Sequence, residues 1–385
     1  MPRAKHQPAP HPTQAIHTIL DAPGIAILPL DTRWAATVHA GTSAPRFLHA
    51  VRTIEGTATH GPTTWHAPTI HSALIALPNT PLLQRAVRVL GPRAVTLAVE
   101  LDPNQHPIDP LLTPAIEEGY LHLRLAPWAN ALGPNLLLAD GLTSVHTHAQ
   151  AQDFAQRLSA SGIPAQAFAS LSPATPNATP AGQPSTLVRL PKRGSFAVDR
   201  VGLVPAEDVR RLLTVRVLFV CTGNTCRSPM AQAIGQSLAE RLPPGSVPIE
   251  VQSAGTAATD GSPPTPEGTE ALRSLGFTPP STRSRRLTTD LLSWADIVWT
   301  MTQSHARATS ALAAPLTPTP AGNGRIVQTL DPDGHDVPDP IGSPASVYRS
   351  TAQALHRLIA DRFAHLQATQ TQHANDQTND TEART

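Results

Sequence analysis

The sequence is poor in the residues on which several classes of protein depend. Among its 385 residues there are only two cysteines, which excludes a disulfide-stabilised scaffold. The longest apolar runs, such as residues 24–30, fall far short of the roughly 20 residues that a membrane-spanning helix needs. Residues 1–12 are rich in proline and histidine and lack the apolar core of a signal peptide. We therefore expect a cytoplasmic protein without a membrane segment.

Charge is also scarce. Charged residues make up 15% of the chain and the formal net charge is +1, which argues against a protein that coats nucleic acid or binds acidic surfaces. Proline, in contrast, is abundant, with 41 residues, so loops should be long and stiff. A chain of this length can bury the cores of two ordinary domains.

The pattern strand, loop, helix stands out in the second half of the chain. Residues 215–220 form a continuous β-branched and apolar run, which predicts a buried parallel strand. The loop 221–227 contains Gly223 and Asn224, the residue types that best tolerate positive φ. Ser228 can cap a helix that runs to about residue 242.

This loop predicts a phosphate site with a nucleophile at its base. Backbone N–H groups that end at a helix N-terminus attract anions, and Arg227 adds a planar fork for two phosphate oxygens. Cys221 stands at the end of the strand, where the loop and Arg227 should stabilise its thiolate, the nucleophilic form. Both cysteines of the chain lie in this loop, and a packing role would not require the Gly, Asn, Arg and Ser around them.

Residues 221–229, Cys-Thr-Gly-Asn-Thr-Cys-Arg-Ser-Pro, resemble the signature of the low-molecular-weight protein-tyrosine-phosphatase family. Further stretches similar to the family lie at 252–256, 295–302 and 339–342. The resemblance implies an α/β domain with a parallel sheet and helices on both faces. It also implies hydrolysis of phosphorylated proteins through a phosphocysteine intermediate, with neither cofactor nor metal.

The resemblance also implies roles for single residues. Cys221 would be the nucleophile, Arg227 would bind the phosphoryl oxygens, and Asp339 would be the general acid. The residues expected to surround the phosphate are Thr222, Gly223, Asn224, Thr225, Cys226 and Ser228. Ser253, at the end of the next predicted strand, could hydrogen-bond Asn224 and support the loop.

The general acid has three competitors nearby, namely Asp331, Asp333 and Asp336. An Asp before Pro is held in an extended conformation, which projects its carboxylate from a stiff loop. Asp339 is favoured because its Asp-Pro-x-Gly context also matches the family.

The substrate is open between phosphotyrosine and phosphoarginine. Tyrosine-directed members place aromatic residues after the Asp-Pro, where this chain has Ile341 and Gly342. Thr225, where many tyrosine-directed members are aliphatic, resembles the bacterial protein-arginine-phosphatase branch. Arsenate reductases share the loop but need a further resolving cysteine, which this chain lacks beyond Cys226. Cys226 could instead trap oxidised Cys221 in a reversible disulfide.

The first half of the chain reads as an α/β domain that resembles the YrdC-like family of threonylcarbamoyl-AMP synthases. The similar stretches are Leu28-Pro29-Leu30-Asp31-Thr32, residues 90–97, Leu123-Arg124-Leu125-Ala126-Pro127, and Ser185-Thr186-Leu187-Val188 followed by 198–213. The Lys-Arg-x-x-x-Pro and Ser-Ala-Asn motifs, with which that family handles nucleotide and substrate, are missing. The resemblance therefore implies the fold without the synthase chemistry. A nucleotide or RNA ligand, and an active synthase fused to a phosphatase, remain the alternatives.

These observations predict four segments. Residues 1–13 would be a disordered lead, 14–213 a degenerate YrdC-like domain, 214–368 a phosphatase domain, and 369–385 a disordered polar tail. The histidines of the first half, including His146 and His148, lack Cys, Asp or Glu at ligand spacing, so no metal site is expected.

Overall fold

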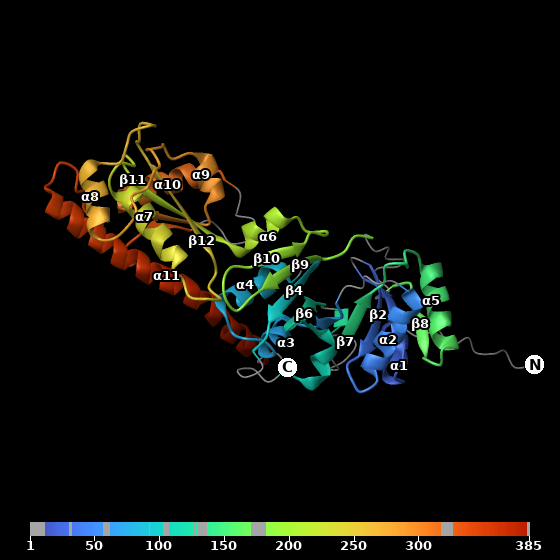
Figure 1. Cartoon of the computed structure of the whole chain (residues 1–385). Coiled ribbons are helices and arrows are strands. Elements are labelled where there is room, and N and C mark those ends of the chain that lie inside the picture. Colours follow the sequence, from blue (N-terminus) through green and yellow to red (C-terminus); the bar gives the residue numbers. More distant parts are fainter. Residues whose placement is uncertain are drawn as a thin grey trace, which may run out of the picture. The chain divides into compact units, whose positions relative to one another are not determined.

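The structure is a computed structural model that describes residues 12–30, 33–56, 62–91, 93–102, 108–126, 128–129, 137–170, 182–316 and 326–382, with side chains described for 13–369 of these. The chain divides into two compact units, Met1–Val209 and Arg210–Thr385 (Figure 1). Most of the expected disordered lead, residues 1–11, lies outside the described residues.

The first unit is built on one mixed sheet. Its helices are α1 (Pro12–Asp21), α2 (Ala44–Glu55), α3 (Ile70–Ile75), α4 (Pro81–Leu90) and α5 (His148–Ala160), with the 3₁₀ helix η1 (Pro110–Ala115). Its strands are β1 (Ile25–Pro29), β2 (Trp34–His39), β3 (Thr64–Ala67), β4 (Val95–Glu100), β5 (Ile116–Glu117), β6 (Tyr120–Leu125), β7 (Leu137–Gly141), β8 (Ala165–Ala167), β9 (Thr186–Leu190) and β10 (Ala197–Arg200). The sheet order is β10-β9-β4-β6-β3-β7-β2-β1-β8, and β5 pairs with β6.

Helix α6 (Ala206–Leu213) contains the division between the units, a few residues before the boundary predicted at 213/214. Its last turn belongs with the second unit because both terminal nitrogens of Arg211 bind the two carboxylate oxygens of Asp296, at 3.0 and 2.9 Å. This bidentate ion pair fastens the end of the helix to residues that precede a strand of the second sheet.

The second unit has a four-stranded parallel sheet. Its strands are β11 (Val215–Cys221), β12 (Ile249–Gly255), β13 (Ile297–Thr300) and β14 (Ile326–Thr329), in the order β12-β11-β13-β14. Its helices are α7 (Arg227–Glu240), α8 (Pro266–Ser274), α9 (Thr289–Trp294), α10 (Gln303–Ala313) and α11 (Ala345–Glu382).

Side-chain alternation along β11 divides the core of this unit between the two faces of the sheet. Val217 and Phe219 pack with α7, α8 and α11, whereas Leu218 and Val220 pack with residues of α9 and with Leu287. All four side chains are fully buried, as the uninterrupted apolar run predicted. The expected α/β fold with a parallel sheet and helices on both faces is thereby confirmed for this unit.

The sheet brings two strand ends together beneath one loop. Cys221 ends β11 and pairs with Gly255, which ends β12. A Cβ atom on Gly255 would lie 2.4 Å from the carbonyl oxygen of Thr222, so this close approach requires glycine. Parallel strands present their carboxyl ends at one edge of a sheet, and the chemistry-bearing residues of the loop begin there.

Two features of the described backbone bear on the sequence predictions. Helix α11 continues to Glu382, so most of the segment predicted as a disordered tail has a helical backbone. Its polar composition argues against burial but not against helix, because residues 345–385 contain no Gly or Pro. None of the helices in the described ranges is both long and apolar enough to cross a bilayer.

Candidate active site

The loop between β11 and α7 folds around Asn224. Asn224 has φ 53°, a left-handed conformation that a non-glycine residue adopts at a cost unless its side chain is held. The residue is 2% exposed, and both the nitrogen and the oxygen of its side-chain amide form hydrogen bonds. Its amide nitrogen donates to Ser228 Oγ and to Ser253 Oγ, both at 2.9 Å, and its amide oxygen accepts the Arg285 N–H at 2.9 Å. Asn224 therefore joins the loop, the start of α7, the end of β12 and the segment before α9.

The support that the sequence predicted from Ser253 lies in this network. Ser253 is buried, and its hydroxyl donates in turn to Gln232 Oε1 of α7 at 2.6 Å. Arg285, in the segment 281–287, is a residue that the sequence analysis did not single out. It is half-buried, and its side chain donates to the Ser253 carbonyl at 2.8 Å and to Gln252 Oε1 at 2.7 Å. Only the tertiary structure shows which of the three arginines in 281–287 turns inward.

The sulfur of Cys221 lies at the base of this loop. The side chain is 3% exposed, and its Sγ accepts the Asn224 N–H at 3.3 Å. Ser228 Oγ lies 2.9 Å from the same sulfur. The sulfur thus has one backbone donor and one hydroxyl beside it, and Cys221 precedes the N-terminus of α7, where the helix dipole has its positive end.

Arg227 and Asp339 meet beside the loop. Arg227 is 4% exposed; its Nη1 donates to the Val337 carbonyl at 3.0 Å, and its Nη2 forms an ion pair with Asp339 Oδ2. The Arg227 Nε has no hydrogen-bond partner among the described residues. A buried guanidinium with one N–H unsatisfied is a ready donor for an anion in the loop.

The three competing aspartates have other contacts. Asp336 Oδ1 accepts the Gln303 N–H at 2.8 Å, which caps α10. Asp331 accepts the Asp333 N–H at 2.8 Å and lies 3.5 Å from His335 Nδ1. Of these four aspartates, Asp339 is therefore the one in contact with Arg227.

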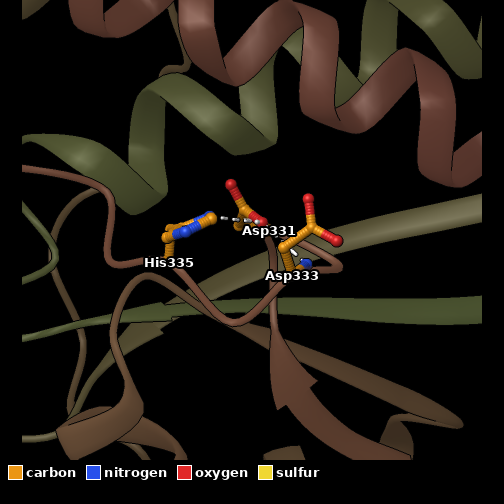
Figure 2. Close-up of side chains that lie close together, drawn as sticks. All are labelled: Asp331, Asp333 and His335. Carbon is orange, nitrogen blue, oxygen red and sulfur yellow. Dashed lines mark hydrogen bonds and ion pairs between the residues drawn. The ribbon is translucent and has the colours of Figure 1, made fainter.

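Figure 2 shows Asp331, Asp333 and His335 close together in the turn after β14, with the His335 ring directed at Asp331. Their ligand atoms lie within 4.8 Å of one another, which is a spacing that suits a cation. Asp333 and His335 are exposed, and Asp331 already serves the turn as an acceptor. Because clustered exposed carboxylates are common without an ion, we assign no metal site to this group.

His305 is a buried residue near the loop that the sequence analysis did not single out. It lies in the first turn of α10, with its Nε2 2.8 Å from Thr222 Oγ1 and its Nδ1 2.8 Å from Thr302 Oγ1. Burial lowers the pKa of His305, the Arg227 charge lowers it further, and Asp336 and Asp339 oppose the shift. Its only sequence signal was its position three residues after Thr302, the N-cap of the helix.

The second cysteine packs against the closing helix. Cys226 is free, as is Cys221, and its Sγ lies 3.8 Å from the Tyr348 hydroxyl and 3.7 Å from Thr225 Oγ1. Burial, with help from Cys226, raises the pKa of Tyr348 to about 12. Of the other residues expected around the phosphate, Thr222 is exposed, Gly223 and Thr225 are half-buried and Ser228 is buried.

Replacing Asn224 should separate its two contributions. In Asn224→Gly the side-chain hydrogen bonds are lost, but glycine adopts the left-handed backbone without strain. In Asn224→Ala the same hydrogen bonds are lost and the backbone strain remains. We expect both variants to lower the free energy of unfolding of the second unit, and Ala to lower it by about 1 kcal/mol more than Gly. Urea unfolding of the full chain, followed by tryptophan fluorescence, measures this, and equal losses in the two variants would contradict the role of the backbone conformation.

Comparison with known proteins shows which family the second unit resembles. The family described as low molecular weight phosphotyrosine protein phosphatase matches residues 216–372. A protein-arginine-phosphatase of Geobacillus stearothermophilus is 36% identical over 149 residues, which are 39% of this chain and 93% of that protein. The low molecular weight protein-tyrosine-phosphatase PtpB of Staphylococcus haemolyticus is 33% identical, over 38% of this chain and 95% of that protein.

Among solved structures, the YwlE arginine phosphatase from Geobacillus stearothermophilus has 34% sequence identity and a TM-score of 0.35, and the match covers 41% of this chain and 97% of that one. The homologues are phosphatases, and the matched residues contain the whole loop around Cys221. The chain is thus a phosphatase hydrolase, and through its second unit it belongs to the low molecular weight phosphotyrosine protein phosphatase family.

Proposed function

We propose that the second unit hydrolyses phosphorylated side chains of proteins, with Cys221 as the nucleophile. The observation that carries this proposal is the position of its sulfur, which is buried at the base of a loop with Asn224 N–H and Ser228 Oγ as its neighbours. The reaction needs the thiolate of this sulfur, and the loop beside it would hold the phosphoryl group. No other free thiol in the described residues has such neighbours.

The reaction has two steps. The Cys221 thiolate attacks phosphorus, the bond from phosphorus to the leaving atom breaks, and the Asp339 carboxylic acid gives that atom its proton. The Asp339 carboxylate then takes a proton from water as the water oxygen attacks the phosphocysteine, which releases inorganic phosphate and restores the thiolate. One residue serves as acid and then as base.

Arg227 changes partners during this cycle. In the free site its Nη2 is paired with Asp339, its Nη1 donates to the Val337 carbonyl, and its Nε has no partner among the described residues. A bound phosphoryl dianion competes for these donors, because a bidentate contact with two phosphoryl oxygens is the geometry that a guanidinium prefers. Asp339 is 40% exposed and can turn toward the leaving atom once the pair opens. Donors fixed in this way stabilise the equatorial oxygens in the transition state.

The roles of Cys221 and Asp339 are separable with two substrates. Cys221→Ser should abolish hydrolysis of aryl phosphates. Asp339→Asn should lower kcat by about 10²- to 10⁴-fold for phenyl phosphate and much less for 4-nitrophenyl phosphate, whose leaving group needs no proton. Steady-state kinetics on purified full-length variants measure both effects. Asp333→Asn, which alters an exposed carboxylate in the turn after β14, is the matched control; an equal loss for both substrates would remove Asp339 from the role of acid.

The substrate side chain remains a choice between phosphoarginine and phosphotyrosine, since the relatives include phosphatases of both kinds. Two residues favour phosphoarginine. Thr225 is half-buried in the loop with its hydroxyl against Cys226, and a hydroxyl can accept a hydrogen bond from a guanidinium. Ile341, which follows Asp339-Pro340, is 63% exposed and offers no aromatic ring on which a tyrosine could stack.

Thr225→Ile tests this preference. We expect the variant to lose activity on phosphoarginine peptides by about tenfold or more while activity on phosphotyrosine peptides is kept or raised, because the aliphatic side chain removes the polar contact and adds apolar area. The ratio of kcat/KM for the two peptides, in the parent and the variant, gives the answer. If the parent prefers phosphotyrosine and the ratio does not change, the substrate is phosphotyrosine.

A second function is favoured by a cavity in the first unit. The cavity has a volume of about 320 Å³ and its lining includes three arginines, Arg33, Arg124 and Arg200, together with His66. The hydroxyl residues of the lining are Thr64, Thr96, Thr143 and Ser185. No carboxylate lines it within the described residues, and burial with the Arg124 charge lowers the pKa of His66 to about 3.

We propose that this cavity binds a phosphate-bearing ligand of the nucleotide class, which agrees with the resemblance to the YrdC-like family. Isothermal titration of the full chain with ATP and AMP should show binding that Arg124→Ala abolishes. Arg189→Ala is the control, because Arg189 lies on strand β9 of the same sheet, is paired with Asp199, and is absent from the lining. Equal affinity in the two variants, or none in the parent, would remove the nucleotide from this cavity.

A further inference from the structure

His305 links the first turn of α10 to the loop that holds Cys221. Its ring is bounded by two hydroxyls, with Nε2 2.8 Å from Thr222 Oγ1 and Nδ1 2.8 Å from Thr302 Oγ1. Thr302 is the N-cap of the helix, and its Oγ1 also accepts the His305 N–H at 3.2 Å. The ring is 7% exposed whereas Thr222 is exposed, so the bond runs from the interior to the surface of the site.

The backbone around Thr222 is already fixed by β12 and the residues that follow it. The carbonyl of Cys221 accepts the Thr256 N–H at 2.9 Å, and the carbonyl of Thr222 accepts the Ala257 N–H at 3.0 Å. The remaining freedom of Thr222 is the rotation of its side chain, and a β-branched side chain has few rotamers. The contact with His305 selects one of them, at a residue directly after the sulfur.

Burial lowers the pKa of His305 below its ordinary value of 6.5, so the ring is neutral at pH 7. The charge of Arg227 on α7 acts in the same direction, and Asp336 and Asp339, from the loop before α11, act against it. A neutral ring carries one N–H and one lone pair, so each nitrogen matches a hydroxyl, which can donate or accept. When Nε2 carries the proton, the Thr222 hydroxyl accepts from the ring and its own proton is available to another acceptor.

We propose that His305 is a positioning residue for the phosphatase reaction: its Nε2 holds the Thr222 hydroxyl so that this hydroxyl can donate to an oxygen of the bound phosphorylated side chain. The inference rests on the proposed function and adds a polar contact at the exposed side of the loop, away from the buried donors around Cys221. A phosphoryl dianion selects the tautomer in which Thr222 offers a proton, because that arrangement supplies a donor to a negative charge. His305 itself touches neither the sulfur nor the substrate, and it acts through Thr222.

Two replacements of His305 distinguish this role from a structural one. The amide of His305→Gln can reach the position of Nε2 and keep the contact with Thr222, whereas the shorter amide of His305→Asn reaches only the position of Nδ1 and keeps the contact with Thr302. We expect the Asn variant to lose about tenfold in kcat/KM for a phosphopeptide, mostly through KM, and the Gln variant to be at least threefold more active than Asn. If the helix cap alone mattered, the order would be reversed.

A double-mutant cycle completes the test. Thr222→Val should lose about as much as His305→Asn, and the double variant should be no worse than either single one, since the second change removes a contact that is already broken. Thermal unfolding of each variant identifies a loss that comes from folding. Additive losses, or equal activity of the Gln and Asn variants, would overturn the inference about His305 but would not affect the proposed phosphatase function. Activity that survives Cys221→Ser would overturn the proposed function, and the inference with it.

Discussion

The site depends on one residue held against its backbone preference. Asn224 has a left-handed backbone, and its buried amide is satisfied by Ser228, Ser253 and the Arg285 N–H. This conformation turns the chain so that the Asn224 N–H points at the Cys221 sulfur. Without the side-chain contacts the loop would relax, and without the turn the sulfur would lack one of its donors. A strained backbone conformation persists only where several contacts hold it in place. Here the three contacts come from α7, from β12 and from the segment before α9.

Electrostatic balance is the second constraint. The guanidinium of Arg227 is buried, and a buried charge must be paired. Asp339 supplies the pair, and its side chain is 40% exposed whereas that of Arg227 is buried. We propose that a phosphoryl group, which is also negatively charged, takes the place of this carboxylate beside Arg227. In the proposed reaction this exchange would keep the buried cation paired both before and after the phosphoryl group binds.

Much of the second unit could be predicted from the sequence, because its strands are continuous apolar runs and its loop consists of residues with special chemistry. The family was predicted from residues 221–229 and is confirmed by the match over 216–372. The strands of the first unit were harder to predict from the sequence. Strand β2 contains Ala35, Ala36 and Thr37, which are small or polar and give little periodic signal, yet all are buried by pairing with β1 and β7. The resemblance of this unit to the YrdC-like family stays a prediction. Arg285 and His305 were missed for a similar reason, since nothing local shows which polar residue of a loop or helix cap turns inward.

Gly255 ends the strand beside the sulfur, and the carbonyl of Thr222 occupies the space that a side chain there would need. The sheet and the loop are consequently in direct backbone contact, with no layer of side chains between them to absorb a shift. The loop cannot open and close in each catalytic cycle as a flexible lid does. In the proposed reaction, changes of shape would fall instead to the side chains at its rim and to the segment that carries Asp339 between Pro338 and Pro340.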